Sequence, residues 1–158
     1  MSNMSGYPHS RITLQVGERR FTTYRRTLIN KSPYFAARIG LETWQDKCSE
    51  VDIDEDGSYF IDADPFIFKY ILNYLRSGDY PIFYDPISRC FDYAKYISLL
   101  SQARQFEISD LKEWIEKKAY LTSIPEADRR MVFEAPVKPA DSGIDFSWMG
   151  AMEGLDTY

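Results

Sequence analysis

Histidine and cysteine are scarce in this chain. Among 158 residues it has one histidine, His9, and two cysteines, Cys48 and Cys90, at no spacing typical of zinc ligands or a disulfide framework. Catalytic sets of the Ser-His-Asp or Cys-His kind need a histidine within the fold, and His9 lies in a polar leader, residues 1–10, that we expect to be flexible. The scarcity therefore disfavours zinc and enzymatic sites, and it favours a reducing compartment, the cytoplasm or the nucleus.

Long apolar runs and an excess of basic residues are also missing. The longest apolar stretch, Phe66–Leu75, is interrupted by Lys69 and is far too short to span a bilayer. The N-terminus lacks the basic and apolar regions of a signal peptide. The net charge is −5, and much of the excess acid lies after Pro125. We therefore expect a soluble protein that binds neither membranes nor, by itself, nucleic acid.

What the chain does have is enough patterned apolar sequence for one domain, over residues 11–123. Apolar residues at positions 12, 14 and 16 alternate with polar ones, which predicts a half-buried strand. Gly17-Glu18 suits a type II′ hairpin turn, and residues 20–24 read as the returning strand. Residues 58–61 form a further predicted strand, and a short one is plausible at 51–53.

Helices are marked by their start and stop signals. Ser32-Pro33 and Asp64-Pro65 each place a capping side chain before a proline at the first helical position. The second of these helices ends at Gly78 and carries one apolar stripe. We expect a single helical turn at 27–30, a loop at 79–90, a helix over about 91–106, and a last helix capped by Ser109 with Trp114 facing inward.

The acidic tail, residues 124–158, holds prolines and glycines and shows no sustained period. We expect it to be largely disordered. Residues 146–152 are the exception, because Phe146, Trp148 and Met149 are apolar. Two interpretations stay open for this segment: a docking motif for another protein, or a segment that packs back on the domain's own surface.

The carboxylates of residues 52–64 could be metal ligands. Asp52, Asp54, Asp56 and Gly57 match the start of an EF-hand calcium loop. The pattern fails where Phe60 and Ala63 replace later ligands, so calcium-regulated folding is only a remote alternative. A turn at 54–57 and a helix cap at Asp64 account for these residues without a metal. No glycine-rich phosphate loop occurs, and we expect no cofactor and no enzymatic activity.

Four arginines bracket the second predicted strand: Arg19, Arg20, Arg25 and Arg26. They could form a basic patch for an anionic partner. Alternatively they form a solvated rim, or pair with an acidic neighbour such as Asp62 or Asp64.

Several stretches resemble the BTB/POZ domain, more narrowly the potassium-channel-tetramerisation type found in voltage-gated channels and soluble KCTD proteins. They are Leu14–Gly17, Phe21–Thr23, Thr27-Leu28, Asp56–Asp62 leading into Pro65 and Phe68, Tyr70–Gly78, and Leu99–Ala103 with Phe106–Ile108 and Leu111. The resemblance covers about residues 12–121. It implies an α/β (α+β) fold, with a small, mostly three-stranded sheet packed on a cluster of about five helices.

The resemblance also implies function. Relatives self-associate as tetramers or pentamers, and many soluble members recruit a cullin-type ubiquitin ligase. By position, the interface between subunits would include Arg19, Arg20, Thr22, Asp56, Tyr59, Asp62, Asp64 and Asn73. Three features depart from the family: Glu18 replaces a glycine, Ala63 replaces an arginine between the two interface acids, and the stretch from 79 to 98 is longer.

Two functional hypotheses follow. The first is a non-enzymatic scaffold that homo-oligomerises and holds another protein through its tail or an aromatic loop. The loop residues are Tyr80, Phe83 and Tyr84. The second is a substrate adaptor for a cullin-type ubiquitin ligase.

Overall fold

A three-stranded sheet forms one end of the protein. The computed structural model describes residues 10–40 and 53–134. The strands are β1 (Arg11–Val16), β2 (Arg19–Tyr24) and β3 (Tyr59–Ile61), in the order β2-β1-β3. β1 runs antiparallel to β2 and parallel to β3. The predicted alternation is confirmed, because Ile12, Leu14 and Val16 are buried on the inner face.

The β1–β2 turn depends on Gly17. Its φ is +51°, whereas Glu18 has no positive φ, which is the combination that a type II′ turn requires. A Cβ at Gly17 would lie 3.1 Å from the Ala63 carbonyl oxygen and 3.3 Å from Pro65. The turn therefore packs directly on the connection between β3 and the next helix.

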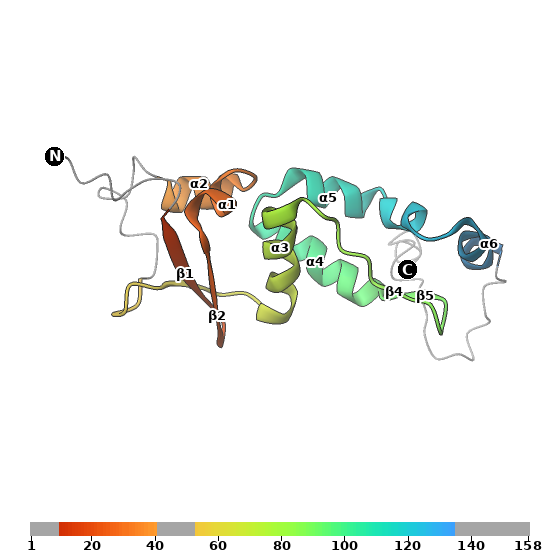
Figure 1. Cartoon of the computed structure of the whole chain (residues 1–158), viewed down its shortest axis with the longest axis horizontal. Helices are drawn as coiled ribbons and strands as arrows, with labels where there is room; N and C mark the ends of the chain where they lie inside the picture. Colours follow the sequence, from red (N-terminus) through yellow and green to blue (C-terminus); the bar gives the residue numbers. More distant parts are fainter. Residues whose placement is uncertain (1–9, 41–52, 135–158) are drawn as a thin grey trace, which may run out of the picture.

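Six helices and one 3-10 segment complete the described chain. They are α1 (Arg25–Ile29), α2 (Pro33–Ile39), α3 (Pro65–Ser77), α4 (Tyr93–Gln105), α5 (Ser109–Glu116), η1 (Ala119–Ser123) and α6 (Glu126–Glu134). α1 and α2 lie beside the sheet, α3 to α5 form the middle, and α6 lies at the opposite end with the short strands β4 (Tyr84–Asp85) and β5 (Cys90–Phe91) (Figure 1). Among the described helices, none combines the length and the apolar character needed to cross a bilayer.

Three predicted helix signals are confirmed. The Ser32 hydroxyl accepts a hydrogen bond from the Phe35 amide at 3.3 Å, and the Asp64 carboxylate accepts one from the Phe66 amide at 2.8 Å. Gly78 ends α3 with φ +80°. These caps satisfy amides that have no partner inside the helix.

Aromatic side chains join the helices to one another. Phe35 stacks on Phe106 with ring centroids 5.2 Å apart, and Phe68 meets the same Phe106 ring edge-on. Towards the other end, Tyr96 stacks on Tyr120 at 3.9 Å. Tyrosine and phenylalanine thus supply much of the core, as their abundance in the sequence indicates.

Three predictions about the elements are corrected. A short antiparallel hairpin, β4 (Tyr84–Asp85) and β5 (Cys90–Phe91), lies where we predict only a loop. Residue Ser109 is the first residue of α5 and makes no capping hydrogen bond, because Ile108 holds the cap position. Finally, α6 occupies residues of the tail that show no clear helical period, and the tail beyond residue 134 lies outside the described residues.

Candidate protein-interaction surface

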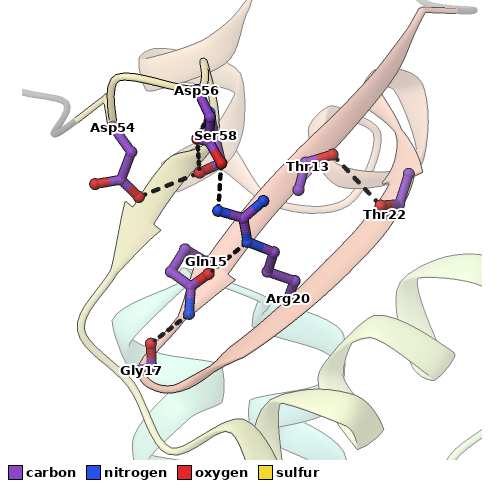
Figure 2. A network of polar contacts seen from close by, with 8 residues as sticks. All are labelled: Thr13, Gln15, Gly17, Arg20, Thr22, Asp54, Asp56 and Ser58. Carbon is purple, nitrogen blue, oxygen red and sulfur yellow. Dashed lines mark hydrogen bonds and ion pairs between the residues drawn. The ribbon is translucent and has the colours of Figure 1, made fainter.

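The outer face of the sheet carries a connected set of polar side chains. We call it the polar sheet face; it comprises Thr13, Gln15, Arg20 and Thr22 from β1 and β2, and Asp54, Asp56 and Ser58 from the turn before β3. Figure 2 shows these side chains pointing to the same side of the sheet. Thr13 lies opposite Thr22 and Gln15 opposite Arg20 in the strand register, so each pair shares one face.

Arg20 is the centre of this network. Its Nε donates to the Gln15 side-chain oxygen at 3.0 Å, and its guanidinium forms an ion pair with Asp56. The Gln15 amide group in turn donates to the Gly17 carbonyl oxygen at 2.9 Å. The chain of contacts links the hairpin turn to the acidic turn across the sheet (Figure 2).

Ser58 stabilises the acidic turn through contacts with Asp54 and Asp56. Its hydroxyl lies 2.6 Å from Asp56 and 3.1 Å from Asp54, and its amide donates to Asp56 at 3.0 Å. These hydrogen bonds, with the Arg20 guanidinium, lower the pKa of Asp56 from 3.8 to about 2. Asp56 is therefore charged at any physiological pH, and Arg20 is held in one orientation.

The same contacts bear on the calcium hypothesis. The two described acids of the proposed loop, Asp54 and Asp56, direct oxygens at Ser58 and Arg20, and Asp52 lies outside the described residues. Within residues 10–40 and 53–134, no group of three or more histidine, cysteine or acidic side chains is placed to hold a metal ion. The geometry of the described residues gives these two carboxylates a role in the turn.

The start of α3 forms a second part of the surface. Asp64 is exposed and caps the helix through one carboxylate oxygen. Asp62 is exposed too, and its carboxylate has no ion-pair or hydrogen-bond partner among the described residues. Between them, Ala63 packs against the core. Arg19 lies over the ring of Phe66, 4.1 Å from its centroid.

Of the alternatives for the arginines, pairing with an acidic neighbour is found for Arg20, although its partner is neither of the two acids named as examples. Within the described chain neither Asp62 nor Asp64 forms an ion pair with any of them, and the acid that binds Arg20 is Asp56. Arg25 donates to the Ile39 carbonyl oxygen at 2.6 Å, and Arg26 lies 5.6 Å from the Tyr24 ring centroid. The pairing escaped prediction because 36 residues separate Arg20 from Asp56 along the chain.

The other two predicted interface residues differ in exposure. Asn73 is exposed on α3. Tyr59 is a correction, because its side chain is 3% exposed and packs in the core beneath the sheet. Its position in β3 places it on the inner face, so it supports the polar sheet face instead of forming it.

The predicted aromatic docking loop packs largely against its own domain. Tyr80 stacks on Trp114 with centroids 4.6 Å apart and remains 38% exposed. Phe83 packs edge-on against Tyr70 at 4.7 Å. Tyr84 packs on Phe91, and burial raises the pKa of its hydroxyl. Tyr80 therefore offers an exposed ring, whereas Tyr84 is mainly structural.

One exposed apolar residue escaped the sequence reasoning. Ile87, at the tip of the β4–β5 hairpin, is 93% exposed. The Asp85 carboxylate accepts hydrogen bonds from the Ile87 amide at 3.0 Å and the Ser88 amide at 3.2 Å, which fixes the tip. Asp85-Pro86 between aromatic residues was the available signal for a turn. The predicted tail motif of Phe146, Trp148 and Met149 lies outside the described residues.

Comparison with known proteins identifies the fold. A family model described as the BTB/POZ domain matches residues 12–110. The chain is 36% identical over 124 residues to human BTB/POZ domain-containing protein KCTD9, covering 77% of this chain and 28% of that protein. It is 32% identical over 127 residues to mouse KCTD5, which covers 80% of this chain and 47% of that protein. It is also 32% identical over 119 residues to human KCTD17, which covers 72% of this chain and 34% of that protein.

The chain thus spans between about a quarter and a half of the length of these relatives. Both the mixed sheet-and-helix architecture and the matched range agree with the resemblance drawn from the sequence. The chain belongs to the BTB/POZ domain family, in its potassium-channel-tetramerisation, KCTD-like type.

Proposed function

We propose that this chain is a non-enzymatic scaffold of the cytoplasm or nucleus. It self-associates as a ring of four or five subunits and holds a second protein. Its family suggests oligomerisation and protein interaction in general terms. The polar sheet face carries the specific proposal, because its Arg20, Thr22 and Asp56 are exposed, and because it is ordered by internal contacts and adjacent to the acids at the start of α3.

Unpaired charges support a contact between copies of the chain. Among the described residues the Asp62 carboxylate has no partner, and Arg11 and Arg19 have no carboxylate partner. In a ring, each subunit presents two different surfaces to its neighbours, so an arginine of one copy can meet Asp62 of the next. Such an arginine would replace the one that the family usually carries at the position of Ala63.

The fixed orientation of the side chains on the polar sheet face favours association between copies of the chain. Arg20 is already held by Gln15 and Asp56, so little side-chain freedom is lost when a neighbour binds. The direct test is the mass of the intact chain at micromolar concentration. Four or five subunits support the proposal, and a monomer removes its self-association half.

A substrate adaptor for a cullin-type ubiquitin ligase is the second candidate. The observation that favours it is Ile87, a single apolar side chain presented on a fixed hairpin within the longer stretch after Gly78. A pull-down of the purified chain with a cullin amino-terminal domain tests it. Binding that is lost in Ile87→Asp supports the adaptor, and no binding leaves the scaffold alone.

A further inference from the structure

A groove runs between the C-terminal half of α3 and residues 79–83. Tyr70 and Phe83 form its floor, with their rings edge-to-face and 4.7 Å apart. Tyr80 and Ile82 form its walls and are 38% and 43% exposed. Asn73 adds an exposed amide that can donate or accept hydrogen bonds. The groove is thus mainly aromatic and apolar, and it is open to solvent.

The groove is preformed. The Phe83 amide donates to the Tyr96 hydroxyl at 3.0 Å, and that hydroxyl donates to the Pro81 carbonyl oxygen at 3.1 Å. Tyr80 is fixed by stacking on Trp114. Residues 79–83 are therefore tied to α4 and α5, and a ligand would not have to order them.

Cations surround the aromatic floor. Lys69 lies 4.7 Å from the Tyr70 ring centroid, Lys95 lies 5.1 Å from the Phe83 ring centroid, and Arg76 lines the groove. Asp79 is the acid among the lining residues, and Lys95 also approaches Asp92 at 3.6 Å. An apolar floor with positive charge at its rim fits a peptide that has aromatic side chains beside carboxylates.

The tail of this chain has that composition. Asp145-Phe146 and Trp148-Met149 place two rings and a thioether beside a carboxylate, and Asp141 precedes them. The tail continues from α6, which lies at the same end of the protein as β4 (Figure 1). Burial raises the pKa of the hydroxyl of Tyr84, which is next to Phe83, and the negative charge of Asp128 in α6 adds to this. Fully extended, residues 135–145 span about 35 Å.

We propose that the segment Phe146–Met152 of this same chain binds in the groove between α3 and residues 79–83. Its aromatic side chains pack on Tyr70 and Phe83, and the acids that flank the segment, Asp145 and Glu153, face Lys69 and Arg76. The aromatic loop and the tail segment, which the sequence predicts as two separate docking sites, therefore bind each other. This inference deepens the proposed function, because a protein partner reaches the groove by displacing the tail.

Site-specific photocrosslinking in the full chain tests the proposal. The probe is p-benzoylphenylalanine in place of Trp148, which keeps an aromatic side chain there. After irradiation, mass spectrometry of the digested protein should place the main crosslink in residues 70–83. Lys69→Glu should lower the yield about five-fold, the effect of one exposed ion pair on a binding constant. Lys112→Glu, an exposed change on α5 outside the groove, should leave the yield unchanged.

Mixed isotopic labelling identifies the chain to which the tail binds. Equal amounts of labelled and unlabelled chain are mixed before irradiation, and crosslinks within one chain should dominate. Crosslinks mainly between chains, crosslinks outside the groove, or a yield indifferent to Lys69→Glu each overturn the proposal. The mass of the assembly is measured separately, so failure of this inference leaves the test of self-association intact.

Discussion

Arg20 on β2 forms an ion pair with Asp56, in the turn that precedes β3. The two residues are 36 positions apart, and the contact joins the first hairpin to the start of the third strand. It also fixes a guanidinium and a carboxylate on the exposed face of the sheet (Figure 2). The arrangement of this face therefore depends on a few hydrogen bonds that can be removed one at a time.

Ser58→Ala should destabilise the fold by about 1–2 kcal/mol, because a buried hydroxyl that donates to the Asp56 carboxylate at 2.6 Å and lies 3.1 Å from Asp54 is lost. Urea denaturation measures the change. Ser101→Ala, an exposed change on α4, is the matched control and should have little effect. Equal stability of the two variants would contradict the role given to Ser58.

The contribution of Asp56 should persist to low pH. Its pKa falls from 3.8 to about 2 on folding, so the unfolded chain binds more protons between these values. The stabilisation is present above pH 3.8 and is lost as the pH falls through about 2. The melting temperatures of wild type and Asp56→Asn should therefore differ by a constant amount above about pH 4 and converge towards pH 2. Convergence already at pH 5 would contradict the assignment.

Tyr96→Phe should cost about 1–2 kcal/mol, because the Phe83 amide and the Pro81 carbonyl both lose their partner. Hydrogen exchange should show the loss locally, as faster exchange of the Phe83 amide. Tyr34→Phe serves as the control, since that half-buried tyrosine lies in α2 beside Phe106. Unchanged exchange at Phe83 would exclude the proposed anchoring of the loop.

Two glycine substitutions separate backbone strain from crowding. Gly57→Ala should cost about 1 kcal/mol, because φ is +82° but no atom lies within 4 Å of the added Cβ. Gly17→Ala should cost more, about 2–3 kcal/mol, because strain adds to a 3.1 Å contact with the Ala63 carbonyl oxygen. Thermal or chemical denaturation ranks the two variants. The reverse order would show that the turn does not pack on Ala63 as described.

The sequence predicts the parts of this fold that local signals define. Ser32, Asp64 and Gly78 lie where capping chemistry requires them, so the ends of α2 and α3 could be placed without coordinates. The alternation in β1 identifies its buried face in the same way. These features depend on residues within a few positions of one another.

The features that the sequence did not predict depend on contacts between distant segments. The Arg20–Asp56 pair, the burial of Tyr59 under the sheet and the packing of Phe83 on Tyr70 all join residues from different elements. The β4–β5 hairpin has strands of two residues each, too short to produce a period. Their positions follow from the tertiary packing, which no local pattern specifies.

An interface variant links the surface to assembly. Asp62→Lys should reduce the mass of the assembly. The substitution replaces an unpaired carboxylate at the proposed contact with a positive charge, which repels the arginine of the neighbouring subunit. Asp79→Lys changes charge equally at an exposed position after α3 and should leave the mass unchanged. Dissociation of both variants alike would indicate that net charge, and not the contact, controls assembly.

Self-association is the central claim, and native mass spectrometry of the unmodified chain at micromolar concentration tests it most directly. A subunit has a mass of 18.5 kDa. We predict a closed species of four or five subunits that persists on dilution through the micromolar range. A monomer as the dominant species under these conditions would contradict the account.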